Sequence, residues 1–120
     1  MSLVHEQAAF LRDFAKLIQE ATQQGFIVTA GELLRPIQMQ EIYVKERKSK
    51  TMNSLHLQKL AGDLNFFTPE GKYITTIESL IPLGKYWESL NPKNRWGGNF
   101  DKDWNKVDRF LDAPHFERQV

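Results

Sequence analysis

Two of the three histidines in this chain are each accompanied by an aspartate at a spacing that suits metal-dependent hydrolysis. Asp63 follows His56 by seven residues, and Asp112 precedes His115 by three. A seven-residue spacing is not the i, i+4 pair of a metal-binding helix, but it suits two neighbouring extended segments whose side chains meet at one point. His56, Asp63 and His115 would together form a tetrahedral zinc site with one position left for water.

A zinc site with an open position is typical of catalysis, because the ion lowers the pKa of bound water and polarises a carbonyl group. Hydrolysis also needs a carboxylate that is not a ligand, so that a proton can be moved. Asp112 is predicted to be this general base, since Pro114 makes the turn between it and His115 rigid. The spacing leaves a second interpretation open, in which His56 lies at a strand edge, Asp63 caps a strand end, and residues 112–117 form a loop.

The composition describes an ordinary globular domain. The chain has 120 residues, of which 41% are hydrophobic and 26% charged, and its net charge is +1. This length fits one domain, and the charge balance indicates neither nucleic-acid binding nor a membrane-surface role. Cysteine is absent, which excludes disulfides, thiolate catalysis and cysteine-ligated metals. No apolar run reaches the roughly 20 residues of a membrane-spanning helix, and the charged N-terminal residues do not fit a signal peptide.

Apolar periodicity predicts the elements that would carry these residues. Helices are expected over residues 3–24, 36–44 and 77–90, and strands over 26–30, 60–67, 73–76 and 115–118. Gly25 is expected to end the first helix, and Pro82 to lie in the first turn of the last one. Residues 45–53 and 91–100 are rich in charged and turn-forming residues and are predicted to be loops. The order of elements predicts an α+β domain with a small antiparallel sheet.

Four segments resemble the zinc D-Ala-D-Ala carboxypeptidase and L-alanyl-D-glutamate endopeptidase family. "SLHLQKLAGDL" resembles its S-x-H-x(6)-D motif, and "DAPHFE" its [DE]-x-x-H motif. "RWGGNF" is similar to the W-G-G segment of the phage endolysin branch, and "GELLRPIQMQ" to its Y-R-T-x-x-x-Q segment. The four segments lie in the family's order and span residues 31–117.

The resemblance implies a hedgehog/D-Ala-D-Ala-peptidase fold, in which helices flank a small antiparallel sheet, and zinc-dependent hydrolysis of peptidoglycan stem peptides. It assigns His56, Asp63 and His115 as zinc ligands and Asp112 as the catalytic base. Arg35 corresponds to the family's arginine near the scissile carbonyl, where a fixed cation would stabilise the developing oxyanion.

Further residues are placed by the resemblance or left between two roles. Gln40 and Ser54 match positions linked to substrate contact or to support of the site, and Trp96 belongs either to the substrate cleft or to the core. The chain departs from the family at Lys59, where glycine is common, and Pro36 stands where the family has threonine. The base is an aspartate where the family more often has glutamate.

Two further polar residues, His5 and Glu117, are considered for a role at the site. His5 is predicted to be a surface or boundary residue of the first helix. Glu117 would share a strand face with His115, which leaves two roles open: support of the metal ligand, or a solvated strand end. The solvated end is the expectation favoured by its place near the end of a strand.

The expected protein is a single, monomeric zinc peptidase domain spanning residues 1–120, of the phage or prophage endolysin type. It would be made in the cytoplasm of a bacterial host without a signal peptide and would act on the cell wall after release through a membrane lesion. Its partner is the peptidoglycan stem peptide, with no nucleic acid and no membrane insertion. A carboxypeptidase that removes terminal D-Ala, and a non-catalytic zinc-stabilised virion or cell-wall-binding module, are the alternatives.

Overall fold

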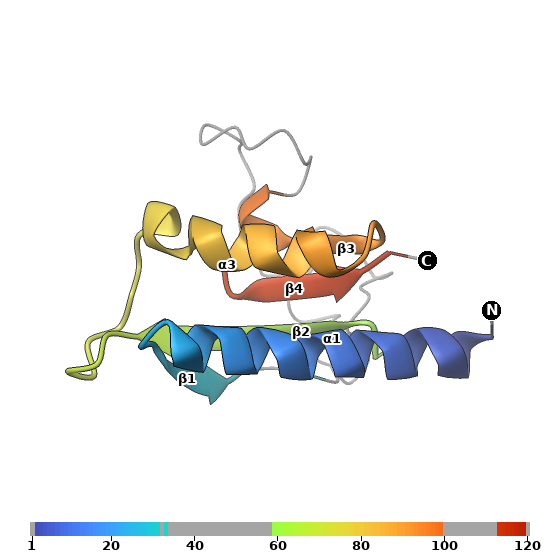
Figure 1. Ribbon diagram of the computed structural model, residues 1–120, viewed down its shortest axis with the longest axis horizontal. Coiled ribbons are helices and arrows are strands. Elements are labelled where there is room, and N and C mark those ends of the chain that lie inside the picture. The colour runs from blue at the N-terminus through green and yellow to red at the C-terminus, as the bar shows by residue number, and fades with distance from the viewer. Residues whose placement is uncertain (1, 32, 34–58, 100–112, 120) are drawn as a thin grey trace, which may run out of the picture.

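A four-stranded antiparallel sheet organises the part of the chain that the computed structural model describes, residues 2–31, 33, 59–99 and 113–119 (Figure 1). The strands are β1 (Ile27–Ala30), β2 (Ala61–Phe67), β3 (Asn94–Trp96) and β4 (His115–Arg118). Their order in the sheet is β1-β2-β4-β3, and all three pairings are antiparallel. The strand that comes latest in the sequence therefore lies inside the sheet, between two earlier strands.

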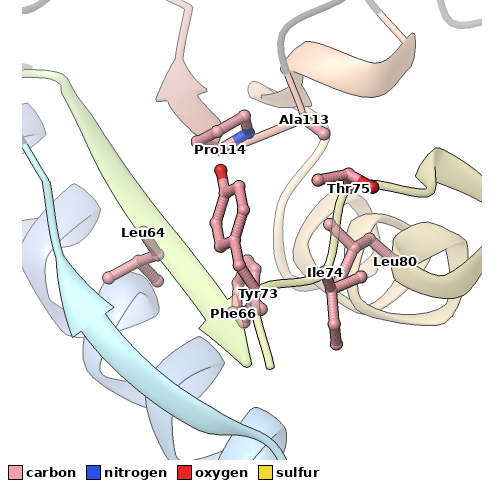
Figure 2. A pocket seen from close by; sticks show the side chains of 8 residues that line it. All are labelled: Leu64, Phe66, Tyr73, Ile74, Thr75, Leu80, Ala113 and Pro114. Carbon is pink, nitrogen blue, oxygen red and sulfur yellow. The ribbon is translucent and has the colours of Figure 1, made fainter. Parts of the chain in front are cut away.

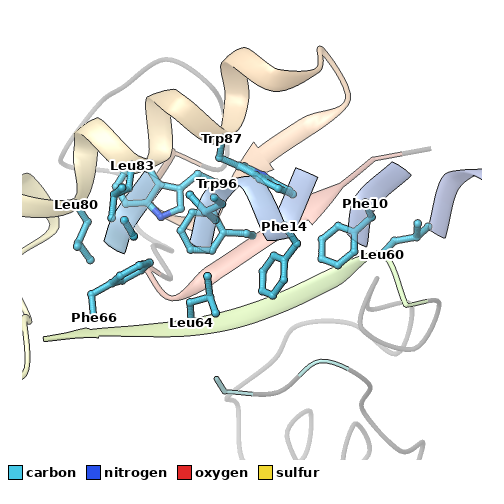
Figure 3. Packing of buried hydrophobic residues seen from close by; sticks show 12 residues of the cluster. Phe10, Phe14, Leu60, Leu64, Phe66, Leu80, Leu83, Trp87 and Trp96 are labelled. Atoms are coloured by element: carbon cyan, nitrogen blue, oxygen red, sulfur yellow. The ribbon is translucent and has the colours of Figure 1, made fainter. Parts of the chain in front are cut away.

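Two helices, α1 (Leu3–Gln23) and α3 (Ile77–Leu90), pack on the same face of the sheet (Figure 1). Trp87 of α3 makes edge-to-face ring contacts with Phe10 and Phe14 of α1, at centroid distances of 5.7 and 6.3 Å. The same ring contacts Phe116 of β4 at 5.9 Å. Because one indole contacts both the other helix and the sheet, it lies at the centre of the core (Figure 3).

The predicted first helix is confirmed. Its buried apolar residues recur at three- and four-residue spacing, which gives the helix one face for the core; they are Phe10, Phe14, Leu17 and Ala21. The hydroxyl of Ser2 accepts a hydrogen bond from the backbone N–H of His5 and caps the N-terminus. Gly25 follows the helix with a φ of +96°, a conformation that glycine adopts without steric cost.

The α1 N-terminal half is also tied to the sheet by buried charges. Glu6 accepts a hydrogen bond from Nε of Arg118 at 2.7 Å and one from Nζ of Lys93 at 2.9 Å. Both Glu6 and Arg118 are buried. These hydrogen bonds lower the pKa of Glu6, the bond from Lys93 most and that from Arg118 next. Electrostatic contacts thus join the first helix to the last strand.

Trp96 is fully buried, so of the two positions left open for it, the core and the substrate cleft, the structure favours the core. Its ring lies between Gly84 of α3 and Gly98, and a Cβ atom at either glycine would overlap it. Its Nε1 donates a hydrogen bond to the carbonyl of Ala113 at 2.8 Å. The "WGG" segment therefore has a packing role here, in which glycines admit a large ring into the core.

Three features between β2 and η2 differ from the sequence-based prediction. Residues 73–76 form no strand, only a single bridge between Tyr73 and Phe67. Part of the predicted loop at 91–100 is instead β3 followed by the 3₁₀ helix η2 (Gly97–Asn99). Pro82 is the sixth residue of α3, beyond the first turn, and leaves one helical carbonyl without its usual donor. The predicted helix at 36–44 and loop at 45–53 lie outside the described residues.

The two faces of the sheet have different chemistry because side chains alternate along a strand. Gly62, Leu64 and Phe66 of β2 face the helices, and a Cβ at Gly62 would come within 2.8 Å of Phe14. The opposite face carries a set of charged and polar side chains, here called the polar face; they are Asp63, Arg95, His115 and Glu117. No helix in the described ranges is long and apolar enough to cross a membrane.

Candidate metal centre

Asp63 of β2 and His115 of β4 are directly opposite each other in the sheet. Directly opposed residues of an antiparallel pair bring their side chains close together. His115 Nδ1 lies 3.3 Å from Asp63 Oδ1, and their side chains are 10% and 22% exposed. The register of the sheet therefore places two of the three predicted zinc ligands side by side, although they are far apart in the sequence.

The other ring nitrogen of His115 meets Glu117, two residues further along the same strand and on the same face. Nε2 lies 2.7 Å from Glu117 Oε1. Glu117 Oε2 in turn accepts from Arg95 Nε at 2.9 Å and lies 2.7 Å from its Nη2. Arg95 is the cross-strand neighbour of Glu117 on β3. The polar face thus holds a continuous chain of contacts from Arg95 through Glu117 and His115 to Asp63.

Burial and charge act in opposite directions on His115. Burial is the largest influence and lowers the pKa of the imidazole, but hydrogen bonds and charge from Asp63 and Glu117 outweigh it and raise that pKa to about 9. For Glu117, burial raises the pKa, while hydrogen bonding and charge from His115, followed by Arg95, bring it below its usual value. In the absence of metal, the two carboxylates beside His115 thus favour the protonated form of its ring.

Asp63 and His115 provide two of the ligands that a zinc site needs. One carboxylate and one imidazole nitrogen face each other, and imidazole and carboxylate are both common zinc ligands. Within the residues that the structure covers, no group of three or more potential ligands is present. The predicted third ligand, His56, lies outside those residues. Asp63 and His115 Nδ1 would hold the ion, which would displace the proton that Nδ1 carries in its absence.

Most of the other predicted site residues lie outside the residues that the structure describes. They are Arg35, Gln40, Ser54, His56 and Asp112. His5 is exposed on α1, as predicted, with Nδ1 2.6 Å from the hydroxyl of Ser2. Glu117 is only 4% exposed, so the expectation of a solvated strand end is wrong.

Arg95 was not predicted as a site residue. Its role depends on the pairing of β3 with β4, and residues 91–100 have a turn-rich composition that hides a three-residue strand. The sequence feature that could have identified Arg95 is its position in "RWGG", one residue before the buried Trp96. In a strand, the neighbour of a core residue faces the opposite side of the sheet, and here that side is the polar face.

A small cavity lies beside the turn that leads into His115 (Figure 2). Its volume is about 170 Å³, and its walls combine apolar side chains with Tyr73, Thr75 and Pro114. Figure 2 shows the Tyr73 side chain pointing toward Pro114. The turn Ala113–Pro114 thus separates this cavity from the metal-ligand candidate that follows it.

No protein-family model and no curated protein matches the chain. Among solved structures, the chain is similar to the crystal structure of the Serratia marcescens L-Ala D-Glu endopeptidase ChiX, with a TM-score of 0.65. The likeness covers 90% of this chain and 79% of that chain. The chain has the fold of ChiX.

This likeness confirms the predicted α+β class, with two helices and a four-stranded antiparallel sheet. The two sequences are 22% identical, a level at which similarity shows the fold alone. In this chain, the pairing of β2 with β4 is what brings Asp63 to His115. The chemistry has to be argued from these side chains.

Proposed function

We propose that this protein is a zinc-dependent peptidase that cleaves peptidoglycan stem peptides, with the L-alanyl-D-glutamate bond as its target. The observation that carries the proposal is the Asp63–His115 pair on the polar face of a ChiX-type fold. An imidazole and a carboxylate in register on adjacent strands form half of a tetrahedral zinc site. The sequence supplies the third ligand, His56, at the spacing of the S-x-H-x(6)-D motif.

A zinc ion bound there would polarise the scissile carbonyl and make a water molecule more acidic. The protein's own groups have separate tasks in this proposal. Asp112 accepts the proton of the attacking water and later gives it to the leaving amine. Arg35 faces the carbonyl oxygen, where its positive charge stabilises the negative charge that develops. Gln40 and Ser54 hold the stem peptide in place.

The decisive experiment is digestion of purified peptidoglycan with the zinc-loaded protein, followed by mass-spectrometric identification of the new termini. The proposal expects fragments that begin with D-glutamate. Release of free D-alanine alone would identify a carboxypeptidase instead. Unchanged peptidoglycan, with zinc bound at full occupancy, would point to a non-catalytic module and overturn the peptidase proposal.

Histidine variants provide matched controls for this digestion. His115→Ala and His56→Ala remove predicted ligands and are expected to abolish both zinc binding and cleavage. His5→Ala removes an exposed histidine of α1 and is expected to leave both unchanged. Equal loss of zinc in all three variants would contradict the assignment of the ligands.

The biological setting that we propose is bacterial lysis by a phage or prophage endolysin. The protein would be made in the host cytoplasm and would reach the wall through a lesion made by a partner. Its release from inside the cell predicts that added protein lowers the turbidity of permeabilised bacteria but not of intact cells protected by an outer membrane. Lysis that requires no permeabilisation would argue against this setting.

A further inference from the structure

We infer that Glu117 and Arg95 are positioning residues for metal binding, with Glu117 fixing the ring of His115 and Arg95 fixing Glu117. The inference deepens the proposed function and rests on it, because it concerns the same candidate centre. Neither residue would touch the metal or the substrate. Their role would be to present Nδ1 of His115 in the form and orientation that a metal requires.

The first step is the geometry of the Glu117 carboxylate, whose two oxygens have different partners. Oε1 lies 2.7 Å from His115 Nε2, and Oε2 is bound by Nε and Nη2 of Arg95 at 2.9 and 2.7 Å. Two guanidinium nitrogens on one oxygen fix the position of Oε2, and the separate contact of Oε1 with His115 fixes the orientation of the carboxylate. Because Glu117 is only 4% exposed, water rarely reaches the carboxylate and does not readily replace His115 or Arg95 as its partner.

The second step concerns the tautomer of His115. A metal binds a neutral imidazole, which carries one N–H and one free lone pair. An ionised carboxylate only accepts hydrogen bonds, so Glu117 requires the proton to be on Nε2. The lone pair is then on Nδ1, the nitrogen that faces Asp63 Oδ1 at 3.3 Å. Metal-ligating histidines commonly donate their second N–H to a carboxylate in this way.

The third step is the role of Arg95, which holds Glu117 in the orientation that His115 needs. The guanidinium of Arg95 offers donors alone, and its Nε and Nη2 both contact Oε2 of Glu117. The other carboxylate oxygen, Oε1, then faces His115 Nε2. The pairing of β3 with β4 keeps Arg95 beside Glu117.

The replacement Glu117→Gln tests the argument because an amide has only one acceptor oxygen. Arg95 offers donors alone, so the amide oxygen should turn to Arg95 and the amide NH₂ should face His115 Nε2. That arrangement favours the proton on Nδ1 and opposes metal binding. Adding Arg95→Met removes the competing donors and frees the amide oxygen to accept from Nε2.

The experiment measures zinc affinity of the full chain by competition with a chromophoric chelator. Glu117→Gln is expected to weaken zinc binding about 10–100-fold, the usual effect of losing such a partner. The double variant Arg95→Met/Glu117→Gln is expected to bind zinc more tightly than Glu117→Gln alone. Glu6→Gln is the matched control, since Glu6 is an equally buried glutamate bound to an arginine, and its zinc affinity should equal that of the parent.

A second measurement requires no variant. Nitrogen chemical shifts of the histidine rings in the zinc-loaded protein should show His115 with its proton on Nε2 and the metal on Nδ1. A proton on Nδ1, or parental zinc affinity in a folded Glu117→Gln protein, would overturn the inference and leave the proposed function standing. A double variant that binds zinc more weakly than Glu117→Gln would exclude the role of Arg95. Failure of the parent protein to bind zinc would instead overturn the proposed function itself, and the inference with it.

Discussion

At the scale of single residues, the surroundings of His115 suit a fixed metal ligand more than a mobile acid or base. The ring is buried and lies between two carboxylates. A proton carrier has to exchange with water and substrate. The proposed base is therefore a different residue, Asp112, which was predicted from its place in "DAPHFE".

The first prediction concerns Asp112. Asp112→Asn retains the size of the side chain but removes the proton acceptor, so hydrolysis should fall by roughly 10²–10⁴-fold. Zinc content and melting temperature should remain close to those of the parent, because the residue is not proposed as a ligand. Peptide cleavage and metal content, measured on the same preparation, check this.

The control for Asp112 is Asp108, an acid four residues earlier in the same segment. Asp108→Asn should leave hydrolysis unchanged. If Asp108→Asn abolished cleavage while Asp112→Asn did not, the interpretation of "DAPHFE" would be wrong.

At the scale of elements, the contact between α3 and β3 depends on glycines, which have no side chain. Gly84 and Gly98 both lie against the six-membered ring of Trp96, at different atoms of that ring. In an exposed helix position, alanine is about 1 kcal/mol better than glycine. Close packing reverses this preference, because the ring cannot move without displacing the surrounding core.

The second prediction is that Gly84→Ala destabilises the protein by about 1–3 kcal/mol, the usual cost of overpacking a core. Urea denaturation monitored by tryptophan fluorescence measures this. Ser89→Ala is the control, since Ser89 is an exposed residue of the same helix and should change stability by less than about 0.5 kcal/mol. A more stable Gly84→Ala protein would show that the contact with Trp96 is loose.

The third prediction concerns the link between α1 and β4 through Glu6. Because the pKa of Glu6 is lowered in the folded protein from its ordinary value of 4.5, its ionised form stabilises the fold above that value. This stabilisation is lost as the pH falls through the lowered pKa. Glu6→Gln cannot ionise, so its melting temperature should be below that of the parent at neutral pH, and the difference should shrink in acid.

Thermal melts of both proteins, in a chelator and from about pH 7 to about pH 3, test the role of Glu6. A difference that stayed constant over this range would show that packing, and not charge, accounts for the effect. A difference that grew as the pH fell would have the wrong sign for a group whose pKa is lowered.

At the scale of the whole molecule, a metal at the polar face would join parts of the chain that are distant in sequence. Asp63 belongs to β2 and His115 to β4, and the predicted ligand His56 precedes Asp63 by seven residues in the sequence. Binding to the folded state alone stabilises it in proportion to the logarithm of the ligand concentration. The metal is therefore expected to act as a cross-link between segments.

The fourth prediction is that zinc at about 100 times its Kd raises the free energy of unfolding by about 2.7 kcal/mol and the melting temperature by about 10 °C. Differential scanning calorimetry with and without a chelator measures the shift. His115→Ala should show no shift. An unchanged melting temperature in the parent after removal of bound zinc would contradict a site made from these segments.

Sequence-based prediction succeeded best where an element carries a recognisable pattern in its own residues. The helices at 3–24 and 77–90 are confirmed because each has its own apolar period. The strand at 115–118 is confirmed as well, although Phe116 is its only apolar residue. The strand β3 was missed, since three residues between turn-forming neighbours have no period of their own. The burial of Glu117 was missed for a related reason: its partner Arg95 lies on that unrecognised strand.

Lys59 shows how a departure from the family pattern acquires a physical meaning. It stands where the family often has glycine, and its φ is +60°, in the left-handed region that glycine favours. The sequence alone indicated a local difference but not its kind. The structure shows that Lys59 itself has a left-handed backbone conformation, which costs about 1–2 kcal/mol for a residue with a Cβ.

The interior place of β4 has a consequence for how the protein folds. β2 and β3 each present an unpaired edge until residues 115–118 insert between them. Closing such long loops is slow, and exposed strand edges invite association with other chains. A nascent chain that has not yet reached residue 115 has neither a continuous sheet nor His115 beside Asp63. The late strand therefore couples completion of the fold to assembly of the candidate centre, so that partly folded chains would be inactive as well as prone to aggregate.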